Sequence, residues 1–240
     1  MMQWVQLFKK NWWNALEDRY FAVRFVINLV VCYALYMYFT NLLVLNRFRE
    51  GVILSDPIQQ LFTPVDLSLH IFILTYTCIL AYIVYIIPRP REFYYAARAF
   101  LVVFILRFSF IYLVPLSPPK TMIVLNDPVL NWIVGNNNEI MNDLFFSGHV
   151  ADVCIFIYCV RYNPLRYFMI VCVIITAIML VWQQVHYTAD VVAAPFFAYV
   201  SYRVFAQKGI ELAVAKQTAE ATATQVITQP APETQRESVY

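Results

Sequence analysis

Residues 167–206 read YFMIVCVIITAIMLVWQQVHYTADVVAAPFFAYVSYRVFA, two apolar runs separated by one short polar cluster. A helix needs about 20 predominantly apolar residues to cross the ~30 Å hydrocarbon core of a bilayer, and each run approaches that length. Neither run alternates polar and apolar residues as a barrel strand does, and backbone groups in lipid must be hydrogen-bonded internally. The stretch therefore predicts two membrane helices, with His186 at the break and Asp190 just beyond it.

The rest of the chain has the same character. Its 240 residues are 61% hydrophobic, 17% aromatic and only 13% charged, and the mean hydropathy is +0.61. This balance excludes an ordinary soluble domain. The sequence predicts an all-α polytopic membrane protein with six transmembrane helices, at residues 23–44, 67–87, 95–116, 147–161, 167–186 and 188–206.

Basic residues predict how these helices are oriented. Thirteen of them flank alternate connections or the ends of the chain: Lys9, Lys10, Arg19, Arg24, Arg89, Arg91, Arg98, Arg161, Arg166, Arg203, Lys208, Lys216 and Arg236. The intervening loops hold three, Arg47, Arg49 and Lys120. The positive-inside rule then places both termini in the cytoplasm. His149 and His186 consequently share the non-cytoplasmic end: a Golgi lumen or the cell exterior in a eukaryote, or the periplasmic side of the inner membrane in a bacterium.

The two ends of the chain differ from the apolar middle. Residues 1–22 place tryptophans among charges, as in an interfacial amphipathic helix, although a solvated cap fits equally well. Residues 208–240 are rich in Ala, Thr, Gln, Glu and Pro and predict a disordered cytoplasmic tail. Between them, residues 23–207 form the expected six-helix catalytic domain. The five cysteines all fall in predicted spans and are expected to be buried apolar residues.

Two of the three histidines lie in short polar clusters beside these spans. Ser147-Gly148-His149 comes 37 residues before His186, and Asp190 follows His186 at the helical i, i+4 spacing. A carboxylate one turn away can hold an imidazole in one tautomer and make it more basic. A second histidine in the same place could donate a proton. The pattern suggests a nucleophile, its orienting group and an acid.

These clusters resemble the sphingomyelin synthases, within the type 2 phosphatidic acid phosphatase superfamily. The family's block H-Y-T-x-D-V-x-x-A is complete from His186 to Ala194. Its block C-G-D-x-x-x-S-G-H-T keeps Asp143 and Ser147-Gly148-His149 but departs at Met141, Asn142 and Val150. Weaker likenesses are Asp56-Pro57, beside a P-L-P-D block, and Arg107 with the prolines that follow it. The resemblance covers roughly residues 50–205.

The resemblance implies a phosphotransferase without metal or cofactor. His186 would attack the phosphorus of a glycerophospholipid, Asp190 would orient it, and His149 would protonate the departing diacylglycerol oxygen. A phosphohistidine-type intermediate would pass phosphocholine, phosphoethanolamine or phosphoinositol to ceramide or a similar lipid alcohol. Membrane lipids are thus the expected partners, and a homo-oligomer is compatible with this. The net charge of +2 is too small to suggest nucleic acid.

Five further residues are candidates for substrate binding: Asp143, Ser147, Gly148, Arg107 and Tyr187. Each has a structural alternative. Arg107 lies inside a predicted span, where an unpaired charge is costly, and a salt bridge to Asp152 is the favoured alternative to phosphate contact. Asp143 more often holds a loop, Ser147 caps a helix as readily as it binds phosphate, and Tyr187 fits an interfacial aromatic belt.

A lipid phosphate phosphatase is the nearest rival. Classical members carry K-x6-R-P, P-S-G-H and S-R-x5-H-x3-D blocks, whereas here Phe146 precedes Ser147, and Met179 and Leu180 occupy the Ser-Arg positions. A phosphomonoester bears about 1.5–2 negative charges and a diester about one, so loss of that arginine favours a diester. A phospholipase C-like hydrolase would use the same residues. A non-enzymatic lipid-binding protein is a third reading, against which the His186–Asp190 pair argues.

Overall fold

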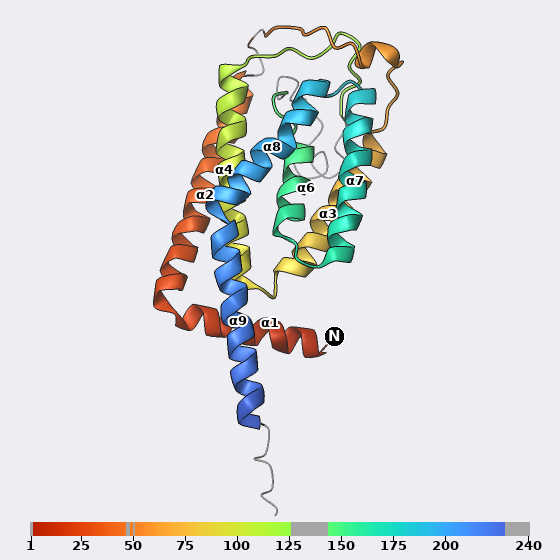
Figure 1. Cartoon of the computed structure of the whole chain (residues 1–240). Coiled ribbons are helices and arrows are strands. Elements are labelled where there is room, and N and C mark those ends of the chain that lie inside the picture. The colour runs from red at the N-terminus through yellow and green to blue at the C-terminus, as the bar shows by residue number, and fades with distance from the viewer. Residues whose placement is uncertain (1, 47–48, 50, 126–143, 229–240) are drawn as a thin grey trace, which may run out of the picture.

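The computed structural model describes residues 2–46, 49, 51–125 and 144–228, and these form helices joined by loops (Figure 1). One isolated bridge pairs Val52 with Leu116. The helices are α1 (Met2–Glu17), α2 (Arg19–Asn46), α3 (Ser68–Ile86), α4 (Pro90–Leu113), α6 (Gly148–Cys159), α7 (Asn163–Trp182), α8 (Thr188–Phe205) and α9 (Gln207–Thr228), with a 3-10 turn at Gln59–Leu61.

Helix α6 is the centre of the bundle. It packs against α3, α4, α7 and α8, and its side chains are buried over most of its length, from Val150 to Cys159. A helix that is apolar on all sides is suited to such a position. The longer helices around it turn apolar side chains outward, for example Val30 on α2, which is 60% exposed, and Ile178 on α7, which is 57% exposed. Such a surface is suited to contact with lipid.

Four helices are long and apolar enough to cross a membrane: Arg19–Phe39 within α2, then α3, α4 and α7. The other two expected spans, 147–161 and 188–206, also form helices, but neither is among these four. At 1.5 Å per residue, the 12 residues of α6 extend only about 18 Å. Because α6 is enclosed by other helices, it can stop short of the full membrane thickness. The expectation of six full spans is thus supported only for four helices.

Helix α9 corrects the expectation of a disordered tail from residue 208. The segment continues from α8 as a helix to Thr228, and residues 229–240 lie outside the described part. Ile210 and Ala213 are buried, and α9 packs against α4. At Gly209, a Cβ atom would stand 2.2 Å from Tyr95 Cε1, so only glycine permits this approach. Low hydrophobicity misled the prediction, because Ala, Gln, Glu and Lys are also strong helix formers.

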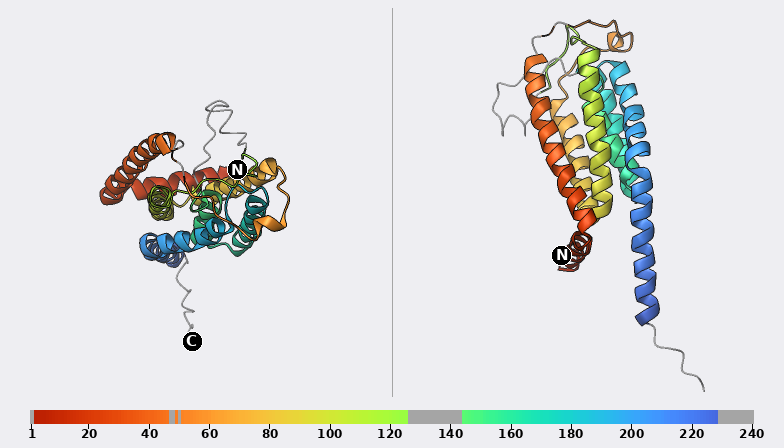
Figure 2. Two further views of the ribbon diagram at one scale, coloured as in Figure 1. Left: turned by 90° about the horizontal axis from the view of Figure 1, so that it is seen from above. Right: turned by 90° about the vertical axis from the view of Figure 1, so that its left-hand side faces the viewer.

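Helices α1 and α9 lie at the same end of the bundle, opposite the starts of α6 and α8 (Figures 1 and 2). Helix α1 crosses beneath the α3–α4 turn, where Asn11 Nδ2 donates to the Pro88 carbonyl at 2.8 Å. Arg91 Nη2 and Asp18 Oδ2 form an ion pair at 2.9 Å beside it. The turn between α6 and α7, with Arg161, lies at this end as well (Figure 1). The cytoplasmic orientation of this end remains a prediction from the sequence.

Candidate active site

His186 lies in the short break between α7 and α8. Gln183 anchors this break, because its side chain accepts from Leu67 N at 2.9 Å and donates to Ser68 Oγ at 2.9 Å and to the Ile123 carbonyl at 3.2 Å. The next residue, Gln184, has a φ of 62°. Residues other than glycine seldom adopt this left-handed backbone conformation. The chain therefore turns sharply here and presents His186 at the end of the bundle.

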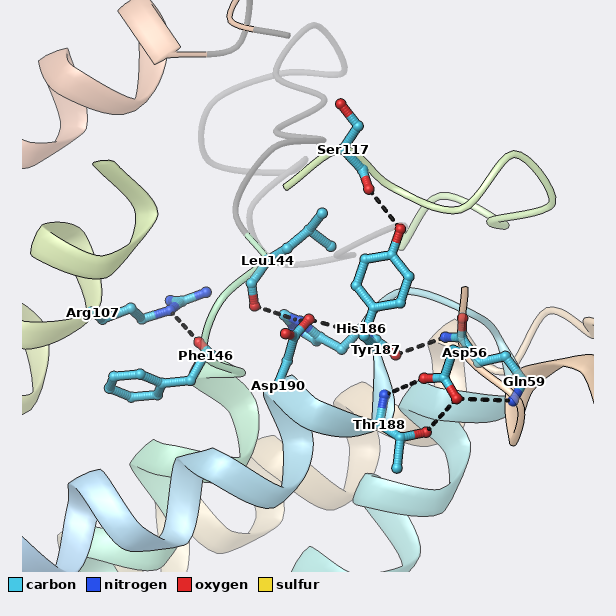
Figure 3. Close-up of polar contacts among 10 residues, drawn as sticks. All are labelled: Asp56, Gln59, Arg107, Ser117, Leu144, Phe146, His186, Tyr187, Thr188 and Asp190. Atoms are coloured by element: carbon cyan, nitrogen blue, oxygen red, sulfur yellow. Dashed lines mark hydrogen bonds and ion pairs between the residues drawn. The ribbon is translucent and has the colours of Figure 1, made fainter. Parts of the chain in front are cut away.

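One ring nitrogen of His186 has a fixed role. Nδ1 lies 3.0 Å from the Leu144 carbonyl oxygen (Figure 3). A carbonyl oxygen only accepts, so Nδ1 must carry the hydrogen in this contact. In the neutral ring, Nε2 then keeps its lone pair, the arrangement that a nucleophile needs. His186 is only 3% exposed.

Asp190 stands beside the same ring nitrogen. Its Oδ2 lies 3.7 Å from His186 Nδ1, and it accepts a hydrogen bond from Tyr187 N at 3.0 Å. The carboxylate thus caps α8 and places negative charge near His186. Among the residues that the structure describes, the other oxygen, Oδ1, has no hydrogen-bond partner, although it is buried. The expected orienting hydrogen bond to His186 is therefore made mainly by Leu144, with Asp190 at longer range.

His149 lies at the second position of α6. Its ring packs edge-to-face on Phe72, with the centroids 5.7 Å apart, and it is within electrostatic range of His186 and Arg107. The Asp190 carbonyl accepts from Ser147 N at 3.2 Å and joins the starts of α6 and α8 directly. His149, which is 37 residues before His186 in the sequence, therefore lies at the same end of the bundle as the His186–Asp190 pair.

Arg107 reaches the start of α6 from α4. Its Nε donates to the Phe146 carbonyl at 3.0 Å (Figure 3). A Cβ atom on Gly148 would stand 2.3 Å from Arg107 Nη1, so glycine is required for the guanidinium to lie there. Ser147 Oγ is buried, with no hydrogen-bond partner among the described residues. A guanidinium, a hydroxyl and a helix N-terminus together suit an anion such as phosphate. The alternative ion pair between Arg107 and Asp152 stays a prediction.

Tyr187 is a buried structural residue, whereas Asp143 lies outside the part of the chain that the structure describes. The Tyr187 hydroxyl donates to the Ser117 carbonyl at 2.8 Å and accepts from Leu54 N at 3.1 Å, and the residue is 1% exposed. It therefore ties two loops to the start of α8 and does not sit in an interfacial belt. Asp143 lies outside the described residues, so its expected role stays a prediction.

Two residues of an early loop also hold the site, and sequence reasoning gave them no such role. Asp56 accepts from Thr188 N at 2.6 Å and from Thr188 Oγ1 at 3.1 Å. Gln59 Nε2 donates to the His186 carbonyl at 2.9 Å (Figure 3). We call Asp56 and Gln59 the loop clasp. Both partners lie more than a hundred residues away in sequence, and the weak P-L-P-D likeness at Asp56 was the available signal.

The loop clasp makes a testable contribution to stability. Burial raises the pKa of Asp56, but hydrogen bonds from Thr188, Gln59 and Ile58 outweigh it, so the pKa lies below its usual value. A depressed pKa contributes stability that is complete above the unfolded-state pKa of about 4 and is lost as the pH falls through the folded-state value. Asp56→Asn should therefore lower the unfolding free energy by about 1 kcal/mol at pH 7.

The difference between wild type and Asp56→Asn should shrink as the pH falls below about 4, because the carboxyl is protonated first in the unfolded chain and then, at its lower pKa, in the folded protein. Thermal unfolding in detergent from pH 3 to pH 7 measures this. The control is Gln60→Ala in the same turn, whose side chain contacts the exposed Ser55 at 3.1 Å and should show no pH-dependent difference. Equal destabilisation by Asp56→Asn at pH 3 and pH 7 would contradict the assignment.

A comparison with known protein families finds a match, and it covers most residues of the candidate site. The family model of the PAP2 superfamily C-terminal domain matches residues 142–208, the part of the chain that carries α6, α7, α8 and both histidine clusters. This match supports membership of the type 2 phosphatidic acid phosphatase superfamily, whose activities are phosphoryl transfer and hydrolysis on membrane lipids. A search of curated proteins finds no match to the chain.

Proposed function

We propose that this protein is a sphingomyelin synthase-like phosphotransferase. It moves the phospho-head group of a glycerophospholipid to ceramide or a similar lipid alcohol and releases diacylglycerol. The observation that carries the proposal is the His186 ring, whose Nδ1 is engaged by the Leu144 carbonyl at 3.0 Å. That contact leaves Nε2 as the nucleophile. The complete H-Y-T-x-D-V-x-x-A block from His186 to Ala194 supports the synthase resemblance.

The proposed reaction has two displacements at phosphorus. His186 Nε2 attacks phosphorus, the bond from phosphorus to the glycerol oxygen breaks, and protonated His149 gives its proton to that oxygen. Diacylglycerol leaves. His149 then takes the proton of the acceptor hydroxyl, whose oxygen attacks phosphorus and breaks the P–N bond, regenerating His186. Asp190, 3.7 Å from His186 Nδ1, would stabilise the positive charge on the ring in both steps.

The cation near the phosphate position supports a diester substrate. Arg107 brings one guanidinium to Gly148, and a diester carries about one negative charge against about 1.5–2 for a monoester. The arginine that classical phosphatases carry six residues before the nucleophilic histidine is replaced by Leu180, which is fully buried in the core.

The second candidate function, a lipid phosphatase, has the superfamily match in its favour. We place the site on the non-cytoplasmic side, following the basic residues at the opposite end of the bundle.

Product partitioning tests the reaction class. The purified protein is given labelled phosphatidylcholine, phosphatidylethanolamine or phosphatidylinositol, each with and without ceramide. With ceramide, we expect at least one donor to yield a new sphingolipid. Without ceramide, we expect only slow hydrolysis of the donor, because apolar helices around the site disfavour water. Phosphatidate is the fourth substrate. Efficient release of inorganic phosphate from it, with no ceramide-dependent product from any donor, would establish the phosphatase instead.

A further inference from the structure

An apolar groove lies between α2, α3, α4 and α6, in the half of the bundle farther from His186. Its cavity measures about 370 Å³. Ile83 and Ile86 of α3, Ala97 and Phe100 of α4, and Phe156 of α6 contribute to its walls. Ligand sites are commonly concave and lined by apolar and aromatic side chains, so a groove of this size and lining can hold an apolar molecule.

The position of the groove indicates what that occupant is. Helices α2, α3 and α4, which form three of its walls, are among the four that can cross a membrane. The groove therefore lies at the depth of the hydrocarbon core. Its rim is accessible from the side, because Tyr36 on α2 is 54% exposed and Ile83 on α3 is 42% exposed. At that depth the available apolar molecules are lipid acyl chains.

Helix α1 lies beside the end of the groove farthest from His186. Phe93 lines the groove, and its ring centroid lies 6.2 Å from that of Trp12 and 6.0 Å from that of Phe25. Trp12 is fixed in place by the hydrogen bond from its Nε1 to the Ile87 carbonyl at 2.7 Å. Trp12 and Phe93 form the end stop of the groove.

The other end of the groove points toward the candidate active site. His149 and Phe156 are seven residues apart on α6, so they share one face and lie about 10 Å apart along the axis. Phe156 stacks on Tyr82 of α3, with centroids 4.2 Å apart. Higher on α3, Phe72 contacts His149 and stacks on Tyr76 at 5.7 Å. Packed aromatic side chains of α3 and α6 thus lie between the groove and the site.

We infer that the groove holds one acyl chain of the lipid whose phosphate lies at His186, and that the end stop limits the length of that chain. From Phe72 to Ile86 the α3 axis measures about 21 Å. One leaflet of hydrocarbon is about 15 Å thick, so a chain of that length that starts near His149 enters the groove past Phe156, and only a longer chain reaches the end stop. The placement of the phosphate rests on the proposed function, whereas occupancy of the groove by a chain does not require turnover.

Photo-crosslinking tests this inference without relying on activity. The probe is phosphatidylcholine with a diazirine at the end of one acyl chain, incorporated with the protein into nanodiscs. After irradiation, mass spectrometry should locate the label on residues 93–104 of α4 and near Trp12. Ala97→Phe fills the groove and should reduce this labelling at least fivefold. The matched control is Val84→Phe, which adds the same ring on the exposed side of α3, where Val84 is 55% exposed, and should leave labelling unchanged.

Two further variants separate the possible failures. His186→Ala should label like wild type, so loss of turnover in the proposed reaction leaves the groove inference intact. Trp12→Ala opens the end stop and should increase labelling by probes with longer chains, moving it toward α1. The inference is overturned if label spreads equally over the exposed faces of α3 and α7 and is indifferent to Ala97→Phe, the pattern of bulk membrane lipid.

Discussion

Replacing His186 with alanine should abolish head-group transfer, with a fall in rate of about 10⁵ to 10⁶ and no covalent intermediate. Removal of a nucleophile that acts with its neighbours as a unit has effects of this size. The fold should survive, because the main-chain carbonyl of residue 186 still accepts from Gln59 Nε2. The measurement is twofold: turnover of a labelled phospholipid with ceramide, and retention of the head-group label on denatured protein after a single turnover.

His70→Ala is the matched control for this experiment. His70 is the third histidine of the chain, it is exposed at the start of α3, and it lies outside both histidine clusters. Its replacement should leave the rate within about twofold of wild type, as is usual for exposed positions away from special features. Retention of most activity by His186→Ala would remove His186 as the nucleophile.

Asp190→Asn should slow transfer by about 10² to 10³ and leave the protein folded. A triad carboxylate that alone sets the histidine tautomer costs about 10⁴ on this substitution. Here the Leu144 carbonyl engages His186 Nδ1 at 3.0 Å while Asp190 Oδ2 lies at 3.7 Å, so the tautomer should be preserved. What is lost is the stabilisation of positive charge on the ring, comparable to the loss of one preorganised electrostatic contact.

Asp66→Asn controls for the loss of a carboxylate in this end of the bundle. Asp66 accepts from Ser68 N at 3.0 Å, just before α3 and outside the histidine site. It should affect stability slightly and transfer little. The informative measurement for Asp190→Asn is kcat against KM, with monodispersity in detergent as the check on folding. A fall in kcat beyond 10⁴ would mean that Asp190, and not Leu144, sets the tautomer.

The sequence predicted the helical architecture well, because long apolar runs have few other solutions in a bilayer. It also located the starts of α6 and α8, where Ser147-Gly148-His149 and His186 to Asp190 break those runs. It overestimated α6 as a full span. Hydropathy shows that a segment is apolar, but an apolar segment can be surrounded by lipid or by other helices of the protein. Hydropathy alone cannot distinguish these two environments.

Contacts between distant segments were beyond sequence reasoning. The Leu144 carbonyl, which fixes the His186 ring, is a main-chain group that leaves no trace in residue identity. The loop clasp joins positions up to 132 residues apart, and nothing local to Asp56 or Gln59 indicates where their partners lie. Tyr187 was predicted to bind substrate or to lie in an interfacial aromatic belt, whereas its buried hydroxyl bonds to the backbone of two loops.

The contact between Ser147 N and the Asp190 carbonyl bears on how the protein is made. A ribosome releases the chain from its N-terminus, so α8 leaves after α2, α3, α4, α6 and α7. Until it inserts, His186 lacks Asp190, and the start of α6 lacks its partner. A partly synthesised chain therefore holds a lipid-facing bundle in which the candidate site is incomplete. If the proposed function holds, insertion of α8 completes the site, and the chain cannot react with the lipids of the membrane that receives it before that step.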